Sequence, residues 1–405
     1  MTAQAQVRHA PTRTGSRDWR RVAAAMAVIG WGGNQFTPLL LVYRDRAGYS
    51  QLDVDVFLGG YVVGLVPGLL VAAALSDRRG RRPVLAGGVW TSLLGSLLLA
   101  AGPVLGYAGI FAGRALSGVA VGVAMAVGTA WVSELAAADP ALAPGTGARR
   151  ATVWLTCGFA LGPASAGLLA QFAEPALVLP YAVHAVLCLP VLRWVLAARR
   201  AETGGRSRAP LWRALRVPAA GHRRFVRVVL PMAPWIFGSA GIAYAIVPQQ
   251  VGGEVGGWAL LHAVGLTVAT LGTGVLVQPL ARRLDSASTA RAVVVSMLVM
   301  VAGVALAAVT AQTRSPWLAV GAALLLGGAY GIAVVSGLLE VQRIAGPGEL
   351  AGLTGVYYAL AYAGFLLPAL LAALSGRFGY PATLGVVALV CPGCASGWSK
   401  HLPQQ

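Results

Sequence analysis

A single arginine inside a long apolar segment has the clearest chemical meaning of any residue in this chain. Arg114 lies in segment 110–135, which otherwise consists mainly of alanine, glycine, valine and leucine. Burying a guanidinium group in hydrocarbon costs at least about 2.5 kcal/mol, so the residue needs a partner or a wet cavity. Because arginine keeps its charge, we predict that it binds an anionic group or keeps a carboxylate ionised. Asp53 and Asp55, at the outer end of the second apolar segment, are the predicted partners in a charge relay or proton-coupling site.

Charged residues also cluster in the short connection between the second and third apolar segments. This connection, 75–83, contains Asp77, Arg78, Gly80, Arg81 and Arg82. A carboxylate placed among arginines can form ion pairs or lie at the positive N-terminal end of a neighbouring helix. The connection is therefore predicted to make specific contacts as well as to carry charge.

Two glutamates occupy corresponding places at the inner ends of the fourth and tenth apolar segments. Glu134 is followed by Arg149 and Arg150, and Glu340 is followed by Arg343. We predict that each glutamate faces these arginines, so that both belong to a polar gate at the inner surface.

Polar and aromatic side chains in the middle of apolar segments form a further group. Amide groups within a membrane need hydrogen-bonding partners inside the protein or in a water-filled cavity. The residues that we predict to line a substrate cavity are Asn34, Gln35, Phe36, Trp235, Tyr244, Tyr357 and Tyr358. His184, His262, Tyr330 and Tyr362 are further polar or aromatic residues at similar depths.

Small residues recur at helical spacing in two segments. Gly118 and Gly122 are four residues apart, which allows two helices to approach closely. The fifth segment contains Gly158, Gly162, Pro163 and Gly167, which predicts a bendable helix with a flat glycine face. We expect this face to move against the other half of the chain.

Composition excludes several classes of protein. Of the 405 residues, 57% are hydrophobic and 11% are charged, whereas an average soluble domain is about a quarter charged. The net charge of +18 lies in short segments between apolar runs, so we predict no nucleic-acid partner. Lys400 is the only lysine, which excludes a Walker A loop. Cys391 and Cys394 have metal-site spacing but lack enough neighbouring ligands, so we predict no metal or other cofactor.

Twelve apolar segments are long enough to cross a membrane as helices. They are 22–42, 56–75, 84–101, 110–135, 152–172, 177–197, 225–247, 258–280, 292–310, 317–341, 353–374 and 380–397. The predicted fold is therefore an all-α polytopic membrane protein. Proline and glycine interrupt the twelfth segment, so its completeness is open.

The distribution of basic residues predicts the orientation of these segments. If the N-terminus is inside, 26 of the 31 lysines and arginines lie on the inner side, as the positive-inside rule requires. The predicted organisation is a cytoplasmic tail (1–21), six helices (22–197), a basic cytoplasmic linker (198–224), six more helices (225–397) and a cytoplasmic tail (398–405).

The two halves also resemble one another. Trp31 and Trp235, Pro163 and Pro368, and Glu134 and Glu340 are separated by 204 to 206 residues, as are the arginine pairs that begin at Arg78 and Arg282. A duplicated six-helix unit is typical of secondary transporters.

Three of these motifs together resemble those of the major facilitator superfamily. Residues 73–82 resemble the signature Gly-x-Leu-x-Asp-Arg-x-Gly-Arg-Arg/Lys, with Ala73 in place of the first glycine. Arg114 with its following small residues resembles the family's motif in the fourth helix. Residues 158–167 resemble the Gly-x-x-x-Gly-Pro-x-x-x-Gly motif of the drug:proton antiporter branches.

The resemblance implies two six-helix bundles around a midplane cavity and a cytoplasmic gate that includes Asp77, Arg78, Gly80, Arg81 and Arg82. It implies a monomer in the bacterial cytoplasmic membrane that exports a small amphipathic compound in exchange for protons. Uptake or exchange of a metabolite such as a sugar or an organic acid is the alternative. A non-transporting scaffold or sensor is the second alternative, and the isolated histidines and glutamates argue against an enzyme.

Overall fold

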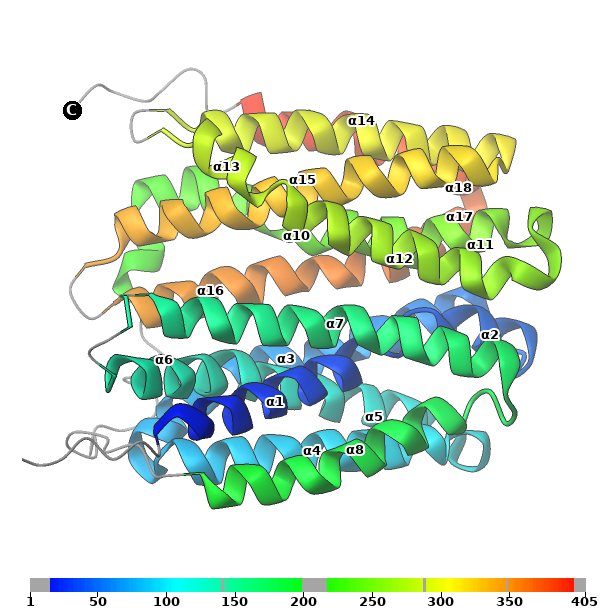
Figure 1. Cartoon of the computed structure of the whole chain (residues 1–405). Helices are drawn as coiled ribbons and strands as arrows, with labels where there is room; N and C mark the ends of the chain where they lie inside the picture. The colour runs from blue at the N-terminus through cyan, green and yellow to red at the C-terminus, as the bar shows by residue number, and fades with distance from the viewer. Residues whose placement is uncertain are drawn as a thin grey trace, which may run out of the picture.

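The computed structural model describes residues 15–139, 142–143, 145–198, 217–286, 289–346 and 349–396. Within these ranges all regular secondary structure is helical (Figure 1). The predicted tails and most of the predicted linker (198–224) lie outside the described residues.

The first half of the chain contains eight α-helices, with one π-helical turn, η1 (Ala124–Gly128), between the fifth and sixth. They are α1 (Gly15–Asn34), α2 (Leu39–Asp45), α3 (Gln51–Arg79), α4 (Arg81–Ala100), α5 (Gly102–Val123), α6 (Thr129–Ala137), α7 (Thr146–Phe172) and α8 (Leu179–Ala197).

The second half is built in a similar way but with more interruptions. Its α-helices are α10 (Leu230–Gly241), α11 (Val247–Val251), α12 (Ala259–Leu276), α13 (Gln278–Leu284), α14 (Arg291–Thr313), α15 (Pro316–Ile344), α16 (Leu350–Ala363), α17 (Leu367–Phe378) and α18 (Tyr380–Ser396). Short 3-10 or π turns are η2 (Pro218–Gly221), η3 (Phe225–Val229), η4 (Ile242–Ile246), η5 (Gly252–Glu254), η6 (Gly256–Trp258) and η7 (Gly364–Leu366).

The described part of each of the twelve predicted apolar segments is mainly helical. Ten helical runs among the described residues are long and apolar enough to cross a membrane. The first predicted segment corresponds to α1 and α2, and the last to α18, whose apolar part Tyr380–Cys391 is short. The helix α3 begins at Gln51, earlier than predicted, because Ser50 and Asp53 form a capping box.

The first segment is broken between Asn34 and Pro38, which the apolar pattern did not predict. The Thr37 N–H donates to Asn34 O at 3.2 Å, so the regular helical pattern ends there. Pro38 has no N–H to continue it and stands at the start of α2. The break places polar and backbone groups at mid-depth in the first half.

The helices of each half pack mainly on one another (Figure 1). Contacts between the halves are made chiefly by α3 with α16 and α17, and by α7 with α12. We call the end at which α1 begins the basic end, because Arg81, Arg149, Arg224 and Arg282 lie there. The other end is called the far end.

Glycines allow the helices within each half to touch through their backbones. A Cβ on Gly118 would lie 1.9 Å from Tyr61 O, and one on Gly122 would lie 2.4 Å from Leu69 N. The close approach predicted for these two glycines is therefore confirmed, and it joins α5 to α3. In the second half, Gly327 packs on Thr270 O of α12 in the same manner, at 2.3 Å.

The glycine face of α7 packs differently from the expectation. A Cβ on Gly158 would lie 2.0 Å from Ala27 O, and one on Gly162 would lie 2.5 Å from Trp31 O. Both glycines therefore pack on α1 in the same half, because α1 and α7 are in close backbone contact. Only Gly167 meets the other half, where its Cβ would lie 2.0 Å from Val264. Pro163 is buried within α7 without ending it.

Candidate functional site

A small cavity lies between the two halves, at the depth of the break in the first segment. Its volume is about 60 Å³, which is room for about two water molecules at about 30 Å³ each. The lining contains seven aromatic residues, namely Tyr61, Phe159, Phe237, Tyr244, Tyr330, Tyr362 and Phe365. The other lining residues are Gly33, Asn34, Leu58, Arg114 and Leu271. Arg114 is the one charged residue in this set.

Aromatic side chains close the cavity both within the second half and across the interface. Within the second half, Phe237 stacks on Tyr362 with ring centroids 4.0 Å apart and an interplanar angle of 17°. Across the interface, Tyr61 of α3 contacts Tyr362 and Phe365 at centroid distances of 6.2 and 6.3 Å. Tyr61 therefore joins the two halves at the cavity.

Arg114 is almost completely buried, with 1% of its surface exposed. Its Nε donates to Phe57 O at 3.3 Å, and its Nη1 donates to Gly33 O at 3.1 Å. The guanidinium carbon lies 4.6 Å from the Phe36 ring centroid and 4.9 Å from that of Tyr61. A guanidinium group has five N–H donors, so these contacts hold it in place but leave donors for a ligand in the cavity.

The predicted ion pair between Arg114 and Asp53 or Asp55 is not formed. The Asp53 carboxylate accepts from Ser50 N at 2.9 Å and caps α3. Asp55 accepts from Gln51 Nε2 at 2.7 Å. The prediction was wrong because both carboxylates lie at the far end of α3, whereas Arg114 turns toward carbonyls and aromatic rings at mid-depth.

Only two of the seven residues predicted to line the cavity do so. Asn34 lines it and donates from Nδ2 to Phe159 O at 2.8 Å, and Tyr244 lines it from η4. Gln35 instead donates to Ser96 Oγ at 3.1 Å inside the first half. Phe36 lies under Arg114, away from the lining.

The other three predicted residues belong to the packing of the second half. Tyr357 donates to Val334 O at 2.9 Å and packs against Tyr358, at a centroid distance of 5.2 Å. Trp235 is partly buried and packs against the hydrophobic core. The sequence could not show which face of each helix these residues occupy.

Three of the predicted gate residues of the first half, Asp77, Arg81 and Glu134, form an ion-pair cluster at the basic end. Arg81 contacts Asp77 at 2.7 Å and Glu134 at 2.9 Å. Gly80 joins α3 to α4 with a φ of 92°, a backbone conformation that glycine adopts without strain. Glu134 thus pairs with Arg81 rather than with the predicted Arg149 or Arg150. Arg150 instead lies over the Trp19 ring at 4.1 Å.

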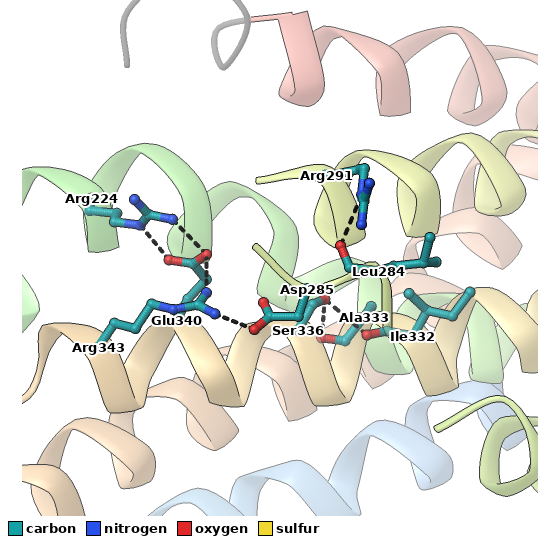
Figure 2. A network of polar contacts seen from close by, with 9 residues as sticks. All are labelled: Arg224, Leu284, Asp285, Arg291, Ile332, Ala333, Ser336, Glu340 and Arg343. Carbon is teal, nitrogen blue, oxygen red and sulfur yellow. Dashed lines mark hydrogen bonds and ion pairs between the residues drawn. The ribbon is translucent and has the colours of Figure 1, made fainter. Parts of the chain in front are cut away.

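A matching cluster occurs in the second half (Figure 2). Glu340 is 2% exposed and lies between two guanidinium groups. Arg224 Nη2 donates to it at 2.8 Å and Arg343 Nη1 at 3.0 Å. Arg343 also pairs with Asp285. The predicted contact with Arg343 is confirmed, whereas Arg224 and Asp285 were missed because they are distant in sequence.

The two clusters bind within their own halves. At the basic end, a groove of about 780 Å³ lies between the start of α7 and the junction of α12 and α13, although α7 and α12 are in contact elsewhere along their length. The lining of the groove includes Arg149 from the first half, and Gln278 and Arg282 from the second. Asp77 is half-exposed and pairs with Arg81 of its own half.

The far end, in contrast, is closed by contacts between the halves. Arg44 Nη1 donates to Gln249 Oε1 at 2.8 Å, and Gln171 Nε2 donates to Gly257 O at 3.0 Å. Gly167 is in contact with Val264 nearby. The cavity is therefore shut from the far end.

A family model described as Major Facilitator Superfamily matches residues 22–369. No curated protein matches the chain.

Solved structures of transporters share the fold at low sequence identity. A D323A mutant of the nucleoside transporter NupG matches with a TM-score of 0.74 and 13% identity, over 94% of this chain and 98% of that one. The xylose transporter XylE from E. coli, in a partially occluded inward open conformation, matches with a TM-score of 0.70 and 14% identity, over 96% and 100%. The human organic anion transporter MFSD10 matches with a TM-score of 0.63 and 18% identity, over 95% and 100%.

Proposed function

Because the chain belongs to the major facilitator superfamily, it is a secondary transporter, and we propose that it exports a small amphipathic organic compound in exchange for protons. The compound binds in the central cavity while the two halves open alternately at the basic end and at the far end. We propose that the protein acts as a monomer in the bacterial cytoplasmic membrane.

The lining of the central cavity is the observation that carries the proposed cargo. Seven aromatic side chains suit an apolar or aromatic body. Arg114 adds a buried positive charge without an acidic partner, which suits an anionic group on the same molecule. The proposed cargo is therefore an amphipathic organic anion.

The proposed direction rests on the fifth-segment motif, which resembles that of the drug:proton antiporters. Uptake of a metabolite such as a sugar or an organic acid is the second candidate. A single buried arginine also suits the carboxylate of an organic acid, so the cavity by itself does not favour one direction.

A transport assay separates the two candidates. A bacterial strain that lacks its own exporters, with and without this protein, is exposed to matched amphipathic acids, neutral compounds and cations. Export predicts lower accumulation of the acids, and a protonophore should abolish the difference. Higher accumulation of an acid in cells that carry the protein would instead establish uptake.

The basic end is proposed to be cytoplasmic, which would make the present arrangement inward-facing. Single cysteines at Ala148, beside the groove, and at Ala47, at the far end, test this orientation in a variant without the native cysteines. Both positions are exposed. A membrane-impermeant thiol reagent should label the cysteine at position 47 in intact cells but leave the one at position 148 unlabelled. The reverse pattern would invert the topology.

Replacing Asp77 by asparagine tests the proposed gate at the basic end. In the present arrangement Asp77 contacts only the partly exposed Arg81, and such pairs contribute less than about 1 kcal/mol. We propose that its charge matters more when the basic end closes. The variant should shift the population toward the inward-facing state by about 5- to 150-fold, the range of typical coupling energies. Distances between labels on α7 and α12 measure the shift, and an unchanged distribution with normal transport would remove Asp77 from the gate.

A further inference from the structure

A chain of polar side chains links the two halves at the far end. Arg44, at the end of α2, donates from Nη1 to Gln51 Oε1 at 2.9 Å and to Gln249 Oε1 of α11 at 2.8 Å. Arg44 is thus held on one side by the first turn of α3 and on the other side by the second half. This guanidinium group is thus one of the contacts that close the far end.

The chain continues inward to a buried carboxylate. Gln51 Nε2 donates to Asp55 Oδ2 at 2.7 Å, so the Gln51 amide lies between Asp55 and Arg44. Asp55 is completely buried, and its Oδ1 has no hydrogen-bond partner among the described residues. A buried carboxylate that is only partly satisfied is costly, and this one lies at an interface that must separate during transport.

The surroundings of Asp55 contain few other charges. Arg44 from α2 and Tyr380 from α18, in the second half, interact with it electrostatically. Asp53 on the same helix is partly exposed and interacts with Tyr49 and with Tyr107 of α5. Among the described residues, Arg44 is therefore the positive charge that acts on Asp55, and Gln51 hydrogen-bonds to both.

We propose that Asp55 is the proton-binding residue of the far-end gate. Asp55 Oδ2 accepts from Gln51 Nε2, which turns Gln51 Oε1 toward Arg44 and so orients Arg44 for Gln249. A proton on Oδ1, which has no partner among the described residues, removes the charge and leaves this hydrogen bond in place. Burying the neutral acid costs much less than burying the ionised carboxylate, so the bound proton favours the closed far end. Loss of the proton leaves a buried charge at the interface and favours separation of the halves.

This inference rests on the proposed exchange of substrate for protons and names the group that takes up the proton. A proton that binds from the open far end, after the substrate has left, closes the gate through which the substrate left. Arg114 then has no part in proton binding, in keeping with its contacts to carbonyls and rings.

The gate can be measured without any substrate, with pH as the only variable. Cysteines at Ala47 and Glu254, which are exposed at the far end of the two halves, carry labels for distance measurements in vesicles. The wild-type protein should shift toward the closed far end by at least about 10-fold between about pH 8 and about pH 5, which brackets the range where a perturbed carboxylate titrates. Another acid at this end, Glu174, stays ionised, because the Ala176 N–H and Arg46 lower its pKa.

Asp55→Asn is the decisive variant, since it keeps the shape of the protonated acid. Its labels should report a closed far end at every pH, whereas Asp53→Asn, two residues away, should follow the wild type. Gln249→Leu should favour the open state at all pH values but retain the pH-dependent shift, because the proton site is intact. An Asp55→Asn protein that opens and closes with pH as the wild type does would overturn the proposal.

The proposed function fails in a different way. If transport proves independent of the proton gradient while the label distances still shift with pH through Asp55, the gate stands and the exchange mechanism is wrong. If transport depends on protons but Asp55→Asn keeps the wild-type pH profile of both transport and distances, the exchange stands and Asp55 is not its proton site.

Discussion

Replacing Arg114 by alanine is expected to reduce transport of the proposed anionic cargo by about two orders of magnitude. Losing one partner of a buried, charge-assisted contact costs about 2–5 kcal/mol. Insertion into the membrane should become easier, because removing a mid-segment arginine saves at least about 2.5 kcal/mol. Arg114→Lys should retain partial transport, since the charge remains but the planar fork of donors is lost. Counterflow in reconstituted vesicles measures all three proteins.

A matched control distinguishes a lost binding site from general damage. Arg193→Ala removes an exposed arginine from α8, and it should transport at the wild-type rate. If Arg114 acts on the anionic group, its alanine variant should lose transport of acids far more than transport of neutral analogues. Equal transport of acids by Arg114→Ala and the wild type would make the residue a packing element.

Replacing Gly118 by alanine is expected to destabilise the first half strongly. The added Cβ would lie 1.9 Å from Tyr61 O, so α3 and α5 would have to move apart. Overpacking of this kind costs about 1–3 kcal/mol. Thermal unfolding in detergent should show a clearly lower midpoint than that of the wild type.

The matched control for Gly118 is Gly272→Ala in α12. A Cβ at Gly272 meets no atom within 4 Å. This variant should be as stable as the wild type or slightly more so, because alanine is the better helix former. Equal midpoints for the two variants would mean that the contact between α3 and α5 relaxes without cost.

The fold could be predicted from the sequence because its main determinants are local. Continuous apolar segments and the placement of arginines fix the helices and their order. The break between Asn34 and Pro38 was missed, since an apolar segment looks the same whether or not its backbone is continuous. Local capping, as at Ser50, extends a helix beyond its apolar segment, and hydropathy alone does not reveal such capping.

A residue of the site was predicted correctly only where its own segment is enough to identify it. An arginine in an apolar segment is visible at once, but its partners depend on how α5 is rotated against α1 and α3. Tyr61 and Phe237 were missed because nothing in their own segments marks them as facing the interface. Glu134 could pair either with Arg149 and Arg150 or with the arginines of the connection 75–83, and in the structure it pairs with Arg81.

The break in the first segment has a consequence for the charge in the cavity. Gly33 lies in the last turn of α1, where the Thr37 N–H bonds to Asn34 instead and leaves the Gly33 carbonyl to Arg114. The C-terminal end of a helix carries about half of a negative charge. Arg114 is therefore stabilised by a helix dipole that only partly neutralises it, and the cavity keeps a net positive potential. Any movement that straightens the junction between α1 and α2 withdraws that carbonyl, so the strength of the anion site depends on the shape of one helix.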